Sequence, residues 1–161
     1  MMLPQLILVD QNVSYAAGLQ LLLHHEGYHI GAYTSDEVLA VLLAKIQRPD
    51  LIILECSAAT GSSLETARRV KEQSPTSHII IHAERPNMEL LAWVLANNIA
   101  GLVRKTDRHQ PLLQALAQTL ATGNFYLQPH VTRDDLTSSN APTLLLDDPQ
   151  VPEEFQHGGF R

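Results

Sequence analysis

The chain has little of several features that would define a function class by themselves. Its 161 residues include a single cysteine, Cys56, so no disulfide can form within the chain. We expect this thiol to be a small buried hydrophobe without chemistry. Lysine and arginine number 11 against 17 aspartates and glutamates, which gives a formal net charge of −6. This balance argues against direct binding to nucleic acid.

Long hydrophobic runs are also missing. The apolar stretches fall well short of the roughly 18 residues that indicate a membrane-spanning helix. The first residues, Met1 to Gln5, place no basic segment before an apolar one. We therefore expect a cytoplasmic protein with no membrane attachment. With 45% hydrophobic residues, the chain can bury one sizeable core, which favours a single domain with a short appendage.

Five short apolar or β-branched runs are predicted strands, at residues 5–9, 29–33, 51–54, 78–81 and 101–103. Segments with helical periodicity separate them. In the first of these segments Ala17, Leu21 and Leu22 are predicted to recur on one face, and Gly27 to end the helix. Continuously apolar strands alternating with helices predict a parallel sheet covered on both faces, a doubly wound α/β fold.

The later helices carry boundary signals. Thr34 and Glu37 are predicted to form a capping box, and Asp107 to cap a helix that ends at Gly123. The apolar positions predicted for these helices and for the third crossover are Val38, Leu39, Leu42 and Leu43, then Leu64, Ala67 and Val70, then Leu112, Leu113, Leu116 and Leu120.

Polar residues follow or end the predicted strands: Asp10, Gln11, Glu55, His82 and Lys105. Ligands of open parallel sheets bind beyond the carboxyl ends of the strands, so we expect these side chains to share one pocket. Acid–base catalysis and metal binding are the chemical alternatives that such a set raises. No nucleophile elbow or phosphate-cradling glycine loop accompanies it, and we expect a protein that is not an enzyme.

Three segments, residues 6–11 (LILVDQ), 48–55 (RPDLIILE) and 100–105 (AGLVRK), resemble the signature segments of response-regulator receiver domains of two-component and phosphorelay signalling. The resemblance covers about residues 4–127. It implies the flavodoxin-like (βα)5 receiver fold with a five-stranded parallel sheet. It also implies a site in which an acidic pair and an aspartate bind magnesium, the aspartate takes a phosphoryl group, and a hydroxyl residue and a lysine contact the phosphate.

Carried over by position, Asp10 and Lys105 match this pattern and three residues depart from it. Gln11 replaces the second acid, Glu55 the phosphoacceptor and His82 the hydroxyl residue. The aromatic residue that rotates on activation in many receivers is replaced by Leu102. The resemblance is therefore to an atypical receiver, a pseudo-receiver that lacks the phosphoacceptor aspartate.

Each departure has a physical consequence. Gln11 offers a neutral ligand where magnesium prefers an anion, so we expect no cofactor and no metal, with weak magnesium binding by Asp10 and Glu55 as the residual alternative. Glu55 is one methylene longer than aspartate, which moves its oxygens toward Lys105 and away from an in-line phosphoryl donor. His82 brings a larger ring, either simply packed or sensitive to pH.

The residues thus favour a receiver-like module that acts without phosphorylation, through a protein partner or a homodimer. Three interpretations of Glu55 stay open: a stabilising pair with Lys105, permanent imitation of a phosphorylated aspartate, and retained magnesium-dependent phosphorylation. A DNA-linked transcriptional regulator that has lost a helix-turn-helix output is a further alternative.

Trp93, Leu113 and Leu116 are candidate interface residues, because residues 88–97 and the helix predicted between Asp107 and Gly123 contain more apolar side chains than one buried stripe needs. For Trp93 the residues favour core packing over an exposed anchor. Residues 128–161 hold four prolines and two arginines against six acidic residues, a formal charge of −4 that leaves −2 for residues 1–127. We expect a domain at 1–127 and an irregular acidic tail at 128–161, disordered or docked.

Overall fold

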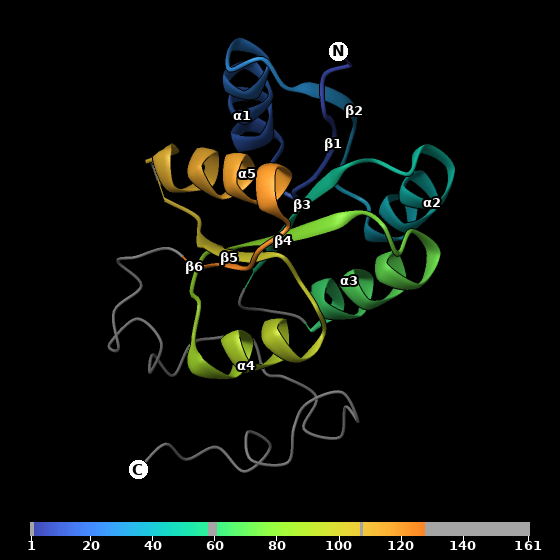
Figure 1. Cartoon of the computed structure of the whole chain (residues 1–161), viewed down its shortest axis with the longest axis vertical. Helices are drawn as coiled ribbons and strands as arrows, with labels where there is room; N and C mark the ends of the chain where they lie inside the picture. Colours follow the sequence, from blue (N-terminus) through green and yellow to red (C-terminus); the bar gives the residue numbers. More distant parts are fainter. Residues whose placement is uncertain (1, 58–60, 107, 128–161) are drawn as a thin grey trace.

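The computed structural model describes residues 2–57, 61–106 and 108–127. Strands and helices alternate along this part of the chain (Figure 1). The strands are β1 Gln5–Val9, β2 His29–Thr34, β3 Leu51–Cys56, β4 His78–Ala83, β5 Gly101–Arg104 and β6 Tyr126–Leu127. The helices are α1 Val13–His25, α2 Glu37–Gln47, α3 Ser62–Gln73, α4 Met88–Ala96 and α5 Gln110–Thr122. The predicted tail, residues 128–161, lies outside the described residues.

All strands belong to one parallel sheet in the order β2-β1-β3-β4-β5-β6. The doubly wound α/β fold is therefore confirmed, but the sheet has six short strands where five were predicted. The additional strand, β6, pairs with β5 through the Tyr126 N–H bond to Ala100. Gly101 permits this approach, since a Cβ there would lie 3.2 Å from the Tyr126 carbonyl oxygen. Two residues are too few to show the alternation from which strands are predicted.

Helices cover both faces of the sheet, as the continuously apolar strands predict. In Figure 1, α1 and α5 lie on one face and α3 and α4 on the other. Alanines of α2, Ala40 and Ala44, pack with the second group of helices. Strand β3 is buried at all six positions because it runs through the middle of the sheet between β1 and β4. Glu55 is thus the one charged residue of a strand that is otherwise apolar.

The start of α2 differs from the prediction. Asp36, not Thr34, is the N-cap, and its Oδ1 accepts the N–H groups of Val38 at 2.8 Å and Leu39 at 3.1 Å. Thr34 ends β2, and its Oγ1 accepts the Asp36 N–H at 2.9 Å. Glu37 accepts a bond from Ser63 of α3 instead of closing a capping box. Aspartate wins the cap because its oxygen reaches two N–H groups at once.

The other helix ends follow the sequence more closely. Gly27 follows α1 with φ +88° and Gly123 ends α5 with φ +68°, the left-handed conformation that glycine adopts without strain. Both predicted helix stops are confirmed. Asp107 lies outside the described residues, and α5 begins after His109, whose side chain makes no capping bond.

Two helices turn a different face to the sheet from the one predicted. In α1 the buried residues are Ala16, Leu19 and Leu23, whereas Leu21 is exposed. In α2 they are Ala40 and Ala44, and most of the larger apolar residues face outward. Both segments are apolar on more than one side, so periodicity alone cannot choose the face. In α2 the face that packs toward the sheet carries the smaller side chains. The stripe predicted for α3 is confirmed.

The predicted interface residues are mostly in the core. Trp93 is 2% exposed and Leu116 fully buried, and Leu113 is partly buried against the α1–α5 side of the sheet. Trp93 packs with the α2–α4 side, where burying its large ring removes the most apolar surface from water. Trp93 and Leu116 therefore do not form a free anchor. Among the described residues, no helix has the length and apolar content to cross a membrane.

Candidate functional site

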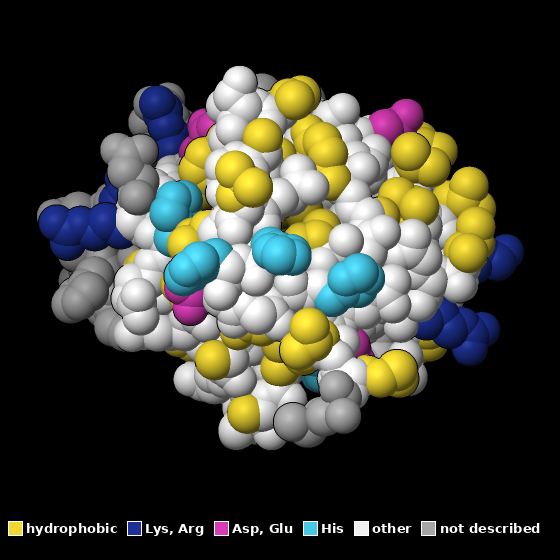
Figure 2. Space-filling view, turned by 90° about the horizontal axis from the view of Figure 1, so that it is seen from above, with side chains coloured by type: hydrophobic (Ala, Val, Ile, Leu, Met, Phe, Trp, Pro, Cys, Tyr) yellow, Lys and Arg dark blue, Asp and Glu magenta, His cyan; other side chains and the backbone are white. Residues whose placement is uncertain are grey.

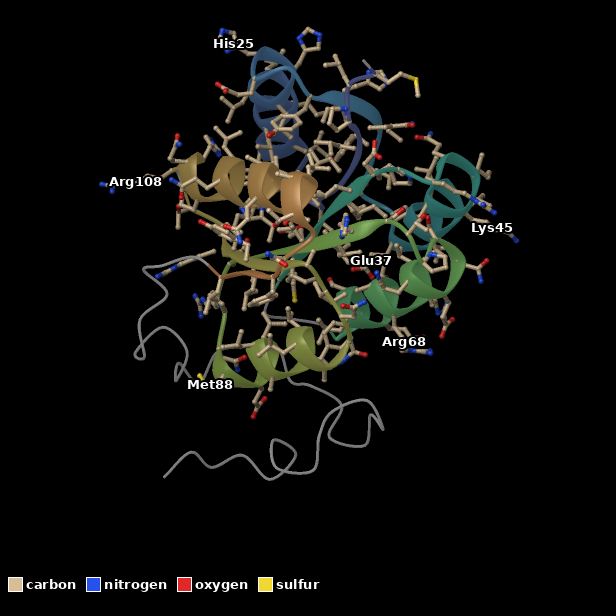
Figure 3. All side chains as sticks on the ribbon, viewed as in Figure 1. His25, Glu37, Lys45, Arg68, Met88 and Arg108 are labelled. Carbon is tan, nitrogen blue, oxygen red and sulfur yellow. The ribbon has the colours of Figure 1, made fainter. Side chains whose placement is uncertain are left out.

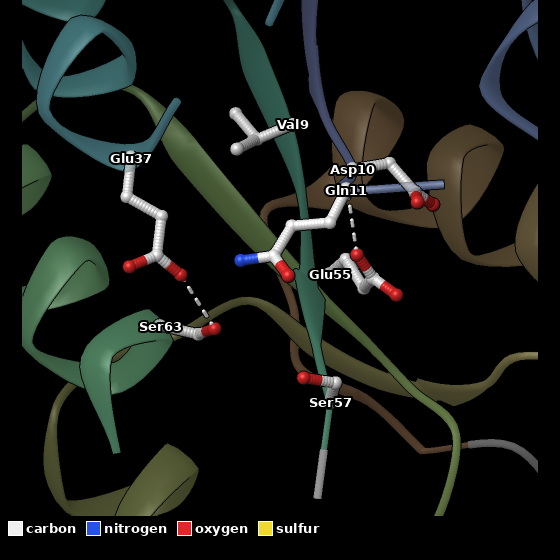
Figure 4. A pocket seen from close by; sticks show the side chains of 7 residues that line it. All are labelled: Val9, Asp10, Gln11, Glu37, Glu55, Ser57 and Ser63. Carbon is white, nitrogen blue, oxygen red and sulfur yellow. Dashed lines mark hydrogen bonds between the residues drawn. The ribbon is translucent and has the colours of Figure 1, made fainter. Parts of the chain in front are cut away.

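The predicted pocket forms at the carboxyl end of the central strands. Asp10 directly follows β1, Glu55 lies near the end of β3, and Lys105 directly follows β5. Glu55 is aligned with His82 of β4 in the parallel ladder. Parallel strands bring these residues to one edge of the sheet although they are as many as 95 positions apart in the sequence. Figure 4 shows Asp10, Gln11 and Glu55 lying close together there.

A buried ion-pair network occupies this edge. The Lys105 Nζ lies 2.8 Å from Asp10 Oδ2 and 2.9 Å from Glu55 Oε1. The three side chains are only 7%, 1% and 8% exposed. One ammonium thus donates to two carboxylates from different strands. Removal from water makes such charges costly unless they are paired and hydrogen-bonded, and here each one is.

Backbone N–H groups bind the remaining carboxylate oxygens. Gln11 N–H donates to Glu55 Oε2 at 2.7 Å, and Asn12 N–H donates to Asp10 Oδ1 at 2.8 Å. Both oxygens of Glu55 therefore accept a bond. Gln11 contributes through its main chain to this network, and its side chain lines the pocket mouth with Glu37, Ser57 and Ser63 (Figure 4).

The pKa values of the three groups reflect competition between burial and pairing. Burial lowers the pKa of Lys105, but hydrogen bonds to Asp10 and Glu55 outweigh it, and the pKa is raised above its ordinary value. Burial tends to raise the pKa of Glu55, and the bonds from Lys105 and Gln11 reverse this and lower it. For Asp10 burial prevails and the pKa is raised. The lysine and Glu55 are accordingly charged near neutral pH.

His82 lies within the protein beside this network. It is 2% exposed, and its Nδ1 has no hydrogen-bond partner among the described residues. Burial lowers the pKa of His82 to about 3, with a further contribution from the positive charge of Lys105. The lowered pKa keeps the imidazole neutral near pH 7, which favours a packed ring over a pH-sensitive one. The packed alternative is the one that the geometry supports.

Sequence reasoning missed Tyr15. Its ring lies 4.3 Å from the Lys105 Nζ, in a cation–π contact. The ring centroids of His82 and His109 are each 5.9 Å from that of Tyr15. Tyr15 comes from the first turn of α1, and no sequence motif distinguishes it from an ordinary helix residue. Only the packing of α1 against the sheet brings it to the lysine.

The donor set fits a metal ion poorly. The described residues contain no group of three His, Cys, Asp or Glu side chains that could hold a metal. Asp10 and Glu55 are the two carboxylates of the site that were expected to bind magnesium weakly, if at all. The Lys105 ammonium binds both of them. A divalent cation would have to displace that ammonium or lie beside it, at an electrostatic cost.

The remaining candidate positions are buried. Leu102 is fully buried in the core. Its side chain is not an aromatic ring, so it cannot perform the rotation that the resembled receivers use. Burial raises the pKa of the Cys56 thiol to about 12, so it is a protonated, unreactive core residue. This agrees with the structural role expected for Cys56.

Comparison with known proteins places this geometry in context. No family model matches the chain. The chain is 24% identical over 156 residues to the oxygen regulatory protein NreC of Staphylococcus epidermidis, covering 88% of this chain and 71% of that protein. It is 29% identical over 139 residues to the probable transcriptional regulatory protein SgaR of Hyphomicrobium methylovorum, covering 85% and 64%.

Solved structures agree with the sequence matches. A LuxR-family two-component response regulator from Aurantimonas sp. SI85-9A1 superposes with TM-score 0.74 and 21% identity, over 81% of this chain and 93% of that one. The isolated REC domain of RcsB from Salmonella enterica gives TM-score 0.70 and 19% identity, over 84% and 99%. The chain has the response-regulator receiver fold. Its curated relatives are regulators by name.

Proposed function

We propose that this receiver-type module works without phosphorylation and transmits its state through contact with another protein. The observation that carries the proposal is the Lys105 ammonium bound by both Asp10 and Glu55. In the receivers that this chain resembles, the equivalent lysine contacts the phosphoryl group. Here a carboxylate of the chain itself takes that contact, so the charge arrangement needs no phosphate.

Glu55 is poorly placed to accept a phosphoryl group. Its Oε1 is bound by Lys105 and its Oε2 by the Gln11 N–H. An in-line attack would have to release one of these bonds inside a buried site, and orientation of this kind is a large part of the rate of any transfer. His82 fills the position of the hydroxyl residue with a neutral ring.

The pocket also lacks the parts that would report an added phosphate. Leu102, at the position of the switching aromatic, is fully buried in the core. Glu55 and Lys105 instead form a permanent pair, which holds the ends of β3 and β5 in one arrangement. The module is then constitutive, and its output depends on the presence of its partner.

The partner that we propose is a protein in the cytoplasm, and not DNA. The formal net charge of −6 opposes approach to a polyanion. The chain spans 71% of the oxygen regulatory protein NreC and 64% of the probable transcriptional regulatory protein SgaR.

The test is to incubate the wild-type protein with magnesium and acetyl phosphate and to record its intact mass and its light-scattering mass. We expect no added phosphoryl mass and no change in assembly. The matched variant is Gln11→Asp/Glu55→Asp/His82→Thr, which restores the three residues of the resembled pattern and is expected to take the label. A stable phosphoryl group on the wild type, absent from Glu55→Gln, would overturn the proposal and favour a phosphorylatable receiver.

A further inference from the structure

Helix α2 presents an apolar stripe to solvent. Val38 is 76% exposed, Leu39 41%, Leu42 50% and Ile46 69%. In Figure 2, hydrophobic side chains gather along the edge where α2 lies, beside basic ones, and in Figure 3 Lys45 points outward from the same helix. Scattered apolar residues are common on surfaces, but a continuous group on one helix face indicates a contact.

Helix α2 buries small side chains and exposes large apolar ones, which is the reverse of the usual arrangement. The face against the sheet carries Ala40 and Ala44, and the outward face carries the larger valine, leucines and isoleucine. A surface helix ordinarily buries its largest apolar side chains and exposes polar ones. The core packing of this domain therefore does not explain why the outer face is apolar.

The stripe is symmetric about its centre. Val38, Leu42 and Ile46 follow one another at intervals of four residues and form a single ridge, with Leu42 in the middle. If a second α2 lies antiparallel to the first with Leu42 on a two-fold axis, Val38 of each copy lies opposite Ile46 of the other. The surface is then complementary to itself, as an isologous interface requires.

The charges at the ends of α2 have the same symmetry. Asp36 is the exposed N-cap and Arg48 the exposed C-cap, each six positions from Leu42 and so about 9 Å from it along the helix. In the antiparallel pair the Asp36 of one copy lies level with the Arg48 of the other. The helix dipoles are also opposed, which is the favourable orientation. A parallel pair would bring like charges together.

We propose that a second copy of this chain docks on α2, with the two helices antiparallel and Leu42 on the two-fold axis. The contact continues onto α3, because Val38, Val41 and Leu42 line a surface pocket together with Arg69, Glu72 and Gln73. These polar residues supply the rim that surrounds the apolar centre of an interface. The dimer contact uses apolar residues of α2 that are not part of the Lys105 network, so it goes beyond the proposed function and does not depend on it.

Cysteine pairing tests the geometry directly. Leu42→Cys in the full chain should form an intermolecular disulfide under mild oxidation, because residue 42 meets its own copy at the axis. Val38→Cys mixed with Ile46→Cys should cross-link between the two proteins, and each alone should cross-link much less. Leu21→Cys, on α1 with the same 76% exposure as Val38, is the matched control and should not form the intermolecular disulfide. Cys56 is buried and does not compete.

Sedimentation equilibrium of the unmodified chain gives the second measurement. We expect the mass to rise from one copy toward two with concentration, and Leu42→Asp to raise the dissociation constant at least about tenfold, while Leu21→Asp leaves it unchanged. Circular dichroism checks that each variant is folded. A wild type that stays monomeric, or a Leu42→Cys variant that cross-links no faster than Leu21→Cys, overturns the proposal.

Discussion

At the residue scale, Lys105 connects three strands that are far apart in the sequence. Its ammonium binds Asp10 after β1 and Glu55 of β3, and lies over the Tyr15 ring of α1. A buried pair of this kind adds little net stability over an apolar replacement of the whole network. Loss of one member is different, because the others remain buried and charged.

Replacing Lys105 with methionine should therefore lower the free energy of unfolding by about 3–5 kcal/mol. The change leaves Asp10 and Glu55 without a cation in a buried site. Urea denaturation at neutral pH measures it. Lys45→Met, at an exposed position of α2, is the control and should change the value by no more than about 0.5 kcal/mol. Equal midpoints for the two variants would show that the network is not energetically coupled.

The low pKa of His82 predicts that the folded protein loses stability as the pH falls. Its pKa is about 3 in the folded protein against 6.5 for an ordinary histidine. Between these values the unfolded chain binds a proton that the folded chain does not, so stability falls as the pH is lowered through this window. The contribution is at most about 1.4 kcal/mol for each pH unit.

The measurement is the free energy of unfolding of wild type and His82→Gln at several pH values from 7 down to about 4. The wild type should lose stability more steeply than the variant. His25→Gln, whose side chain is 86% exposed, is the control and should follow the wild type. Parallel curves for wild type and His82→Gln would mean that His82 already binds its proton in the folded state.

At the scale of elements, α2 shows where local signals compete. Thr34 and Asp36 both have a side-chain oxygen that could cap the N-terminus of α2. Asp36, which directly precedes the helix, is the N-cap, and Thr34 accepts the Asp36 N–H instead. The buried face of α2 was also predicted wrongly, because the segment is apolar on two sides.

Strands β1 to β5 were predicted with the right starts, although β3 and β4 each extend two residues further than predicted. Their apolar runs are short and separated by clear breaks.

Asp36→Ala should lower the free energy of unfolding by about 1 kcal/mol, since the N–H groups of Val38 and Leu39 lose their acceptor. Denaturation at low protein concentration measures the effect without a contribution from association. Ser35→Ala, at the exposed neighbouring position, is the control and should have little effect. If Thr34→Ala were the costlier change at the same site, the cap assignment would be wrong.

At the scale of the whole molecule, charge decides which partners can approach. The formal net charge is −6, with −4 of it in residues 128–161 and −2 in residues 1–127. A polyanion gains no release of counterions from such a protein. The charged side chains of the site are buried and bound to one another, whereas the apolar outer face of α2 is exposed to a partner.

The chain should therefore not retard DNA at physiological ionic strength. An electrophoretic shift assay with random and promoter fragments measures this, and a DNA-binding protein of the same size run beside it is the control. A retarded band that weakens with salt would contradict the prediction, because phosphate contacts give that salt dependence.

From the sequence alone one could determine the fold class and the edge of the sheet that carries the site, while the pairing of Glu55 with Lys105 was one of three open interpretations. Strand periodicity and the rule for parallel sheets act locally, so the residues report them directly. Only the tertiary structure decided that Tyr15 covers the lysine, that Trp93 and Leu116 lie in the core, that β6 joins the sheet, and that α2 turns its alanines inward. Each of these depends on which surfaces pack together, and a segment that is apolar on two sides does not carry that information until its neighbours are in place.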